Sequence, residues 1–300
     1  MDFIKRLFKG DKEREEIFYA YLLLIPALLI IGAFRIYPLI RGLLESFHQS
    51  FYSPEGFVKE FVGLKNYFEL IKSSTFQNSL LVTLKFNLII IPIQIILSLI
   101  LAVLLNSKKP GINYLRGIFL IPIAMSDPIA SVIWKILLNP NDGLINGLLV
   151  SIGIPAQPFF TSTSQALWSI ILMASWKGVA FWMIFLVAGI GDIPDRIYEA
   201  AEIDGAGPIS KLFHITLPLL KRVLLFVVVA NTIANFLLFA PMYIITKGGP
   251  EGTTNVLMYL SYKNGFVYNN MGYSMAIIFM LIFLVLLIIG IEFKLLETDH

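Results

Sequence analysis

The stretch LLVTLKFNLIIIPIQIILSLILAVLL, from Leu80 to Leu105, decides the fold. Lys85 is its only charged residue. A helix rises 1.5 Å per residue, so this stretch is long enough to cross the roughly 30 Å of hydrocarbon in a bilayer. A surface helix of a soluble protein would instead carry a polar face along its length. The stretch therefore predicts a membrane-spanning helix.

The composition of the whole chain supports this prediction. Of its 300 residues, 57% are hydrophobic and 14% are charged, whereas an ordinary globular domain has about 25% charged residues. The mean hydropathy is +0.78. These values argue against a soluble enzyme, a disordered chain or a coiled coil, and the absence of cysteine excludes a disulfide scaffold. A net charge of +3 argues against binding to nucleic acid.

Six apolar runs have the length of a membrane span. The first run is interpreted as a retained span rather than a cleaved signal peptide, because it carries Arg35 and no small-residue cleavage site follows it. The fold class predicted is an all-α membrane protein with six transmembrane helices and a cytoplasmic helix-turn-helix loop between spans four and five. The six predicted spans are Ile17–Ile40, Leu80–Leu105, Leu115–Leu138, Ala166–Ile190, Val223–Ile245 and Met271–Leu295.

The distribution of basic residues predicts the orientation, because cytoplasmic loops carry an excess of Lys and Arg. The excess lies in the tail of residues 1–16, in the loop after span two and in the loop of residues 191–222. Both termini are therefore expected in the cytoplasm of a bacterial or archaeal cell whose inner membrane holds the chain. The domains expected are the tail 1–16, a transmembrane domain 17–295 and a tail 296–300. The outer segment Arg41–Ser79 is aromatic-rich and is expected to pack rather than float.

The loop of residues 191–222, called the helix-pair loop below, is the most informative segment. Pro194 suits a first helical position, and residues 194–204 form a predicted short helix followed by Gly205 at the turn. A second helix is predicted from Pro208. Such a loop is often a solvated linker, but two short amphipathic helices need a surface to pack against, which indicates docking on a soluble partner. The apolar face of the second helix is predicted to hold Ile209, Leu212, Phe213 and Thr216.

A known family shares the pattern of this loop. Glu199-Ala200-Ala201, then Gly205, Ile215 and Leu217-Pro218, resembles the complete signature of the permease subunits of binding-protein-dependent ABC importers. Further strings resemble the carbohydrate branch, which includes the maltose and glycerol-3-phosphate permeases. These strings are Gly63-Leu64-Lys65-Asn66-Tyr67, Trp176-Lys177-Gly178 and Thr246-Lys247-Gly248-Gly249-Pro250.

The resemblance implies a coupling role for the loop. In the family, the helix pair sits in a cleft of a separate ATPase subunit, the residue equivalent to Glu199 pairs with a basic group there, and the residue equivalent to Gly205 makes the bend. Asp204 belongs to the same implied contact. The implied partners are a second homologous permease, two ATPase subunits, an extracytoplasmic solute-binding protein, membrane lipid and a sugar. ATP and Mg²⁺ would bind to the ATPase, so this chain is expected to need no cofactor or metal and to hold no catalytic residue.

Polar residues inside the spans are candidates for function, because a polar group facing lipid is costly. For Asn87 and Gln94, which share one face of span two, hydrogen bonds between helices are favoured over ligand binding. Asp127 and Lys177 fit either an ion pair or a ligand site. The resemblance implies a sugar site in spans four and five, where Lys177, Ala234 and Leu238 depart from the maltose permease and indicate a ligand other than maltodextrin, with an anionic or more polar group. The substrate-binding residues predicted are Trp176, Lys177, Gly178, Phe181, Asn231, Asn235 and Asp127.

Two other classes of protein remain as alternatives. Gly189-Ile190-Gly191-Asp192 matches a short string of the intramembrane aspartyl proteases, and Asp127 could supply the second carboxylate of their dyad. An ion-coupled secondary transporter would also span the membrane, but it would leave the helix-pair loop without a role. No phosphate-binding loop of the Walker type is present, so the chain is not expected to hydrolyse ATP itself.

Overall fold

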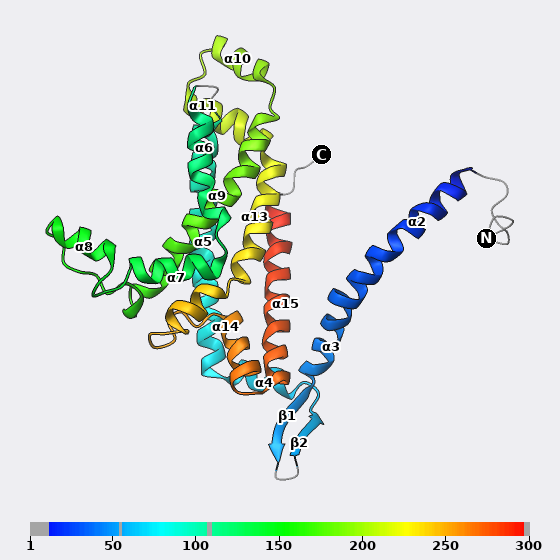
Figure 1. Ribbon diagram of the computed structural model, residues 1–300. Coiled ribbons are helices and arrows are strands. Elements are labelled where there is room, and N and C mark those ends of the chain that lie inside the picture. The colour runs from blue at the N-terminus through cyan, green and yellow to red at the C-terminus, as the bar shows by residue number, and fades with distance from the viewer. Residues whose placement is uncertain (1–11, 54–55, 107–109, 297–300) are drawn as a thin grey trace.

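Four helices form the centre of the molecule (Figure 1). The computed structural model describes residues 12–53, 56–106 and 110–296. Helix α5 packs along α9, and α13 contacts α5, α9 and α15. Buried apolar side chains between these helices form clusters toward both ends of the bundle. The four helices are α5 (Ser74–Leu105), α9 (Ala166–Gly191), α13 (Lys221–Phe236) and α15 (Met271–Leu296).

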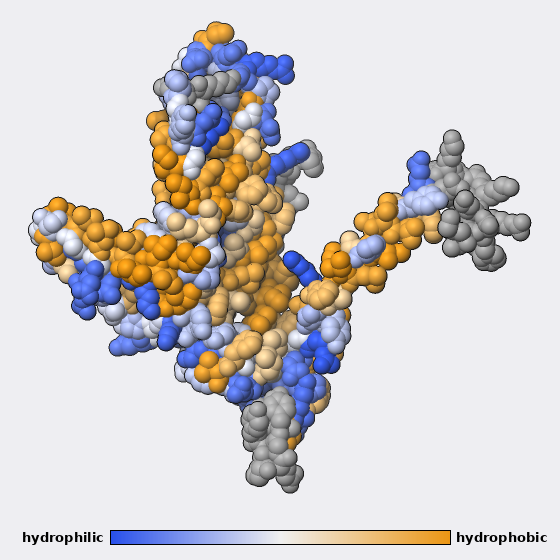
Figure 2. Space-filling view, in the orientation of Figure 1, coloured by the Kyte–Doolittle hydropathy of each residue, from blue (hydrophilic) through white to orange (hydrophobic). Residues whose placement is uncertain are grey.

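The described residues contain four helices that are long and apolar enough to cross a membrane, or up to six if each of two bent pairs counts as one span. The four are Glu16–Ser46, Ser74–Leu105, Ala166–Gly191 and Met271–Leu295. They agree with predicted spans one, two, four and six. The apolar surface of these helices stands out in Figure 2, with polar residues gathered at the ends of the molecule.

The third predicted span is bent rather than straight. Helix α6 (Ile112–Leu120) continues into the 3₁₀ segment η2 (Ile121–Ala124), and α7 (Asp127–Leu137) then leaves at 98°. Pro122 lies in η2 and Pro128 at the start of α7, and each removes an N–H donor from a continuing helix. Hydropathy detected the apolar run but not the change of direction. The bend brings the first turn of α7 against α9.

The fifth predicted span, Val223–Ile245, is too long. Helix α13 ends at Phe236, and the expected continuation is a separate π-helical segment, η5 (Met242–Thr246). A turn at residues 237–239 separates the two, and Pro241 directly precedes η5. At its other end, α13 meets the segment Pro208–Leu219 at 74°.

The first span lies apart from the bundle (Figure 1). It consists of α2 (Lys12–Ile31), the π-helical segment η1 (Gly32–Ile36) and α3 (Tyr37–Ser46), and α3 contacts α15. No residue in the most apolar 18-residue stretch of this span is buried against the rest of the described chain. The start of α2 and the end of α15 both lie away from the β-hairpin described next.

The outer segment that follows α3 packs, as expected, but it contains an unpredicted β-hairpin. Strand β1 (His48–Ser53) pairs antiparallel with β2 (Gly56–Phe61), and α4 (Lys65–Lys72) follows. Asn66 of α4 is fully buried and donates hydrogen bonds from Nδ2 to the carbonyl oxygens of Ser46 and His48, at 2.8 and 2.9 Å. The amide thus ties the hairpin to α3. Further short elements are α8 (Leu144–Ser151), η3 (Phe159–Thr161), α14 (Leu257–Tyr262) and η6 (Lys263–Val267).

Gly272, at the start of α15, allows the hairpin to approach this helix closely. A Cβ atom at Gly272 would clash with the backbone oxygen of His48 and lie 2.9 Å from its carbonyl carbon. We expect Gly272→Ala to destabilise the protein by about 1–3 kcal/mol, the usual cost of overpacking. Thermal unfolding in detergent measures the change.

Gly290→Ala is the matched control, because it lies in the same helix and its Cβ would meet nothing within 4 Å. This control should be neutral or stabilising by up to about 1 kcal/mol, since alanine favours a helix. Equal stability of the two variants would contradict the close contact between β1 and α15.

Candidate functional site

A cavity of 260 Å³, called the central pocket, opens among α5, α7, α9 and α13. Five of the seven predicted substrate-binding residues line it, and the remaining lining residues are mostly apolar. The lining consists of Gln94, Ile123, Asp127, Met173, Ala174, Lys177, Gly178, Phe181, Trp182, Ala234, Asn235 and Leu238.

Gln94 connects three helices beside this pocket. Its side chain is 2% exposed, and Nε2 donates to the carbonyl oxygen of Ala174 in α9 at 3.1 Å. Oε1 accepts a hydrogen bond from Asn235 Nδ2 of α13 at 2.8 Å. One turn along α5, Ser98 Oγ donates to the carbonyl oxygen of Val179 at 3.1 Å. The predicted hydrogen bonding between helices is confirmed for Gln94.

Asn87 behaves differently from Gln94, although it shares its face of α5. Its Nδ2 donates to the carbonyl oxygen of Thr83, in its own helix, at 2.8 Å. Its Oδ1 is buried and has no partner within the described part of the chain. The hydrogen bond between helices expected of Asn87 is therefore replaced by a bond within α5.

Gly178 makes room for the Gln94 amide. A Cβ atom at Gly178 would clash with Nε2 of Gln94 and lie 2.6 Å from its Cδ. Small residues of this kind let membrane helices approach closely. Gly178 thus contributes to the pocket by admitting a neighbouring side chain, a role different from the ligand contact that the sequence predicted.

Asn231 and Trp176 lie outside the pocket lining. Asn231 is fully buried, and Asn235 Nδ2 donates both to its Oδ1 and, at 3.1 Å, to its carbonyl oxygen. Trp176 packs edge-to-face on Trp134, with ring centroids 5.8 Å apart. Asn231 therefore positions the side chain of Asn235 without itself lining the pocket. Helical periodicity placed both asparagines on one face but could not tell which of them reaches the pocket.

Asp127 and Lys177 form an ion pair across the pocket. The bend before α7 places Asp127 in the first turn of that helix, where the helix dipole favours a negative charge. Lys177 reaches it from the middle of α9. The side chains are 46% and 24% exposed, respectively, so the pair faces the pocket rather than lying in a dry core. The ion pair that the sequence analysis kept open is confirmed.

The helix-pair loop adopts the predicted helix, glycine turn and helix. Helix α10 (Asp195–Ile203) follows Pro194, which precedes the helix rather than beginning it, and ends at a turn in which Gly205 has φ +81°. Gly205 N–H donates to the Glu202 carbonyl oxygen at 3.1 Å and Ala206 N–H to that of Ala201 at 2.8 Å. This is the Schellman arrangement that satisfies the last carbonyl groups of a helix. α11 (Pro208–Lys211), the π-helical segment η4 (Leu212–Thr216) and α12 (Leu217–Leu219) follow.

Side-chain contacts connect the first arm of the loop, α10, with its second arm, Pro208–Leu219. The hydroxyl groups of Tyr198 and Thr216 lie 3.0 Å apart, and Lys211 forms an ion pair with Glu202 at 3.2 Å. The four residues predicted to form the apolar face of the second arm differ in their exposure. Thr216 is buried and Leu212 half-buried, whereas Ile209 and Phe213 are exposed.

The outer surface of the loop combines exposed charge and exposed apolar groups. Glu199, Ala200 and Asp204 of the signature are exposed, Ala201 is half-buried, and Ile203 is 88% exposed at the end of α10. In the second arm, Ile215 and Leu217 are half-buried, and Pro218 is exposed.

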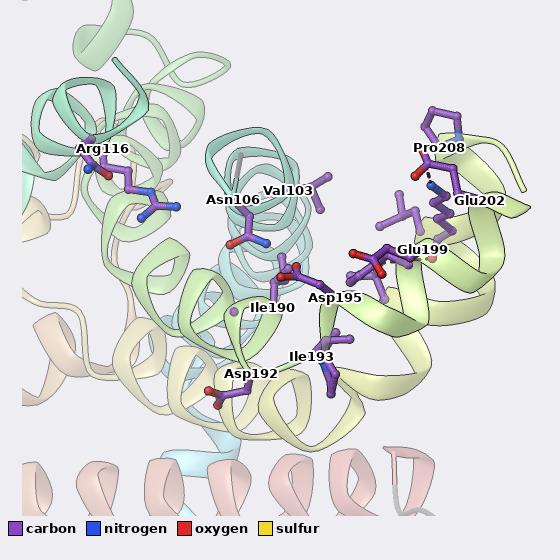
Figure 3. A pocket seen from close by; sticks show the side chains of 17 residues that line it. Val103, Asn106, Arg116, Ile190, Asp192, Ile193, Asp195, Glu199, Glu202 and Pro208 are labelled. Carbon is purple, nitrogen blue, oxygen red and sulfur yellow. Dashed lines mark hydrogen bonds and ion pairs between the residues drawn. The ribbon is translucent and has the colours of Figure 1, made fainter. Parts of the chain in front are cut away.

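A second cavity, of 1050 Å³, lies between the loop and the bundle (Figure 3). The carboxyl groups of Asp195 and Glu199 border it from α10, and Asn106 borders it from the end of α5. Arg116 lines the opposite wall and donates from Nε and Nη2 to the Leu105 carbonyl oxygen, at 2.8 and 2.6 Å. The cavity thus borders the face of α10 that carries Asp195, Glu199 and Glu202.

Asp127 and Asp192 lie too far apart to form a protease dyad. Asp127 pairs with Lys177, and Asp192 follows the end of α9 at the second cavity. Fourteen residues of α9 lie between Lys177 and Asp192, so the Cα atoms of these two residues are roughly 22 Å apart at 1.5 Å per residue. Two carboxyl groups that share a proton must lie within hydrogen-bond distance of each other.

The architecture is that of a membrane protein in which apolar helices surround a mostly apolar pocket with a few polar groups, and a structured loop lies beyond one end. The family model described as "binding-protein-dependent transport system inner membrane component" matches residues 74–294. The chain belongs to this family.

Relatives and a solved structure agree with this assignment. The chain is 33% identical over 279 residues to the sn-glycerol-3-phosphate transport system permease protein UgpA of Shigella flexneri, covering 93% of this chain and 94% of the relative. It is 34% identical over 253 residues to the trehalose/maltose transport system permease protein MalF of Thermococcus litoralis, covering 84% and 83%. A chain of a bacterial alginate ABC transporter, solved with a pentasaccharide-bound periplasmic protein, shares the fold with TM-score 0.84 at 19% identity, covering 96% and 99%.

The contact between Gly178 and Gln94 can be tested with a double-mutant cycle. We expect Gly178→Ala to destabilise the protein by about 1–3 kcal/mol because the new methyl group displaces the Gln94 amide. In a Gln94→Ala background the same change should cost much less, since the obstructing side chain is gone. Thermal unfolding of the four proteins gives the coupling energy, expected between about 0.5 and 3 kcal/mol. Additive effects would contradict the contact.

Proposed function

We propose that the chain forms half of the pathway by which an ABC importer takes up a sugar or a related hydroxylated solute. The central pocket carries this proposal. Asn235 and Gln94 supply amide groups, and Phe181 is 40% exposed beside them. A few placed polar groups in a mostly apolar lining are typical of a small-molecule site. The relatives named for glycerol phosphate and for trehalose and maltose favour the same solute class.

The helix-pair loop is the proposed contact with a separate ATPase subunit. Its exposed apolar residues, such as Ile203 and Ile209, would be covered by docking, and Glu199 would make a charge-assisted hydrogen bond with a basic group of the partner. ATP and Mg²⁺ would bind to that subunit. A transporter driven by an ion gradient would have no use for this surface.

The remaining partners and the orientation follow from the same proposal. The chain would pair with a second homologous permease and with two ATPase subunits, with the loop of residues 191–222 and both tails, 1–16 and 296–300, on the cytoplasmic side. The β-hairpin end and α14 would face an extracytoplasmic solute-binding protein. The described ends of the chain support this orientation, because both lie away from the hairpin (Figure 1).

Asn235→Ala tests the pocket. The variant removes a pocket amide and its bond to Gln94, so we expect solute uptake in cells to fall at least tenfold, a loss of about 1.4 kcal/mol or more. ATP hydrolysis by the purified assembly should persist. Asn264→Ala is a matched control, because this amide bonds only within its own outer segment, to the Leu260 carbonyl oxygen at 2.8 Å. If Asn235→Ala bound the solute with unchanged affinity, the assignment of the central pocket as the solute site would be wrong.

Gly205→Val tests the coupling loop. Valine at φ +81° is strained, so the turn between the arms should change its angle while the spans remain inserted. We expect ATP hydrolysis to continue without solute uptake, measured in parallel on reconstituted vesicles. Gly207→Ala should behave like the wild type, because Gly207 has φ −72° and its Cβ would meet nothing within 4 Å. Normal uptake by Gly205→Val would contradict the coupling role.

A further inference from the structure

The central pocket holds two charges that cancel. Among the described residues that line it, only Asp127 and Lys177 are charged, and they form an ion pair with each other. The pair joins two different helices, α7 and α9, and so depends on the bend that turns α7 toward α9. The remaining polar lining groups are the neutral amides of Gln94 and Asn235.

The positions of the two side chains favour their interaction with each other. Asp127 lies in the first turn of α7, where the helix dipole stabilises a carboxylate. Lys177 is the less exposed partner, at 24% of its side chain, so removing its counter-charge would leave an ammonium group in a partly dry site. An unpaired Lys177 would be a ready site for an anion.

We propose that Asp127 sets the charge selectivity of the pocket: by holding Lys177, it makes the pocket select neutral hydroxylated solutes over anionic ones. This inference rests on the proposed function. An anionic solute would have to displace Asp127 from Lys177 and then lie beside the freed carboxylate, where like charges repel. A neutral solute can donate hydrogen bonds from its hydroxyl groups to the 46% exposed Asp127 carboxylate and leave the pair intact.

Two aromatic side chains in the pocket lining fit a neutral, ring-shaped solute. Phe181 and Trp182 lie edge-to-face with centroids 4.8 Å apart, and both line the pocket. Phe181 is exposed and Trp182 buried, so one ring is available to the solute and the other fixes its position. The C–H face of a pyranose ring packs on such a surface by burying apolar area.

Binding measurements on the full-length chain, purified with its co-purifying subunits in lipid nanodiscs, test the inference. Titration calorimetry would compare a neutral set (maltose, trehalose and glycerol) with an anionic set (sn-glycerol-3-phosphate and glucuronate). We expect the wild type to prefer the neutral set. Asp127→Asn should shift the ratio of affinities at least tenfold toward the anionic set, because it leaves Lys177 unpaired.

Two further variants make the result specific. Asp127→Asn with Lys177→Met removes both charges and should return the ratio to the wild-type side. Asp142→Asn makes the same charge change at an exposed position outside the pocket and should leave the ratio unchanged.

An unchanged ratio in Asp127→Asn, with neutral solutes still bound, would overturn the inference while leaving the proposed function intact. Wild-type preference for the anionic set would overturn it in the same way. If the wild type binds no member of either set and Asn235→Ala has no effect on uptake, both the inference and the proposed function fail.

Discussion

Helices α5 and α9 approach each other closely at Gly178, and this contact positions the helices around the central pocket. The absent side chain at Gly178 admits the Gln94 amide, which then bonds to α9 through Ala174 and to α13 through Asn235. In a membrane, helices gain little from apolar contact with each other relative to lipid, so close backbone packing and hydrogen bonds determine which helices associate. This one amide thus joins three helices and forms one wall of the central pocket.

The same helices connect the pocket to the helix-pair loop. Helix α9 leads through Ile193 into α10, and α12 leads through Leu220 into α13. Ile193 and Leu220 are both buried in one apolar cluster, and Tyr198 of α10 packs against it. A displacement of the loop would therefore move the ends of α9 and α13 together, rather than being absorbed by a flexible linker.

Sequence reasoning succeeded where a pattern is local. The long apolar runs, the glycine turn at Gly205 and the family signature all depend on neighbouring residues, and the structure and the comparisons agree with them. It failed to predict the bends at η2 and after Phe236, because hydropathy reports composition and not the direction of a helix. It also could not separate Asn235 from Asn231, since the difference is made by Gln94 on another helix. The β-hairpin was missed because its pairing is fixed by contacts with α3 and α15.

If the helix-pair loop docks on an ATPase subunit, as proposed, a cysteine placed on its outer surface should be covered in the assembly, and the chain has no cysteine of its own that would label. Ile203 and Phe61 are both exposed, at 88% and 69%, but they end α10 and β2, which lie at opposite ends of the molecule (Figure 1). In the assembly purified without the solute-binding protein, Ile203→Cys should be protected from maleimide and should cross-link to the ATPase subunit, while Phe61→Cys should label freely. Equal labelling of the two cysteines, without a cross-link from Ile203→Cys, would contradict this docking.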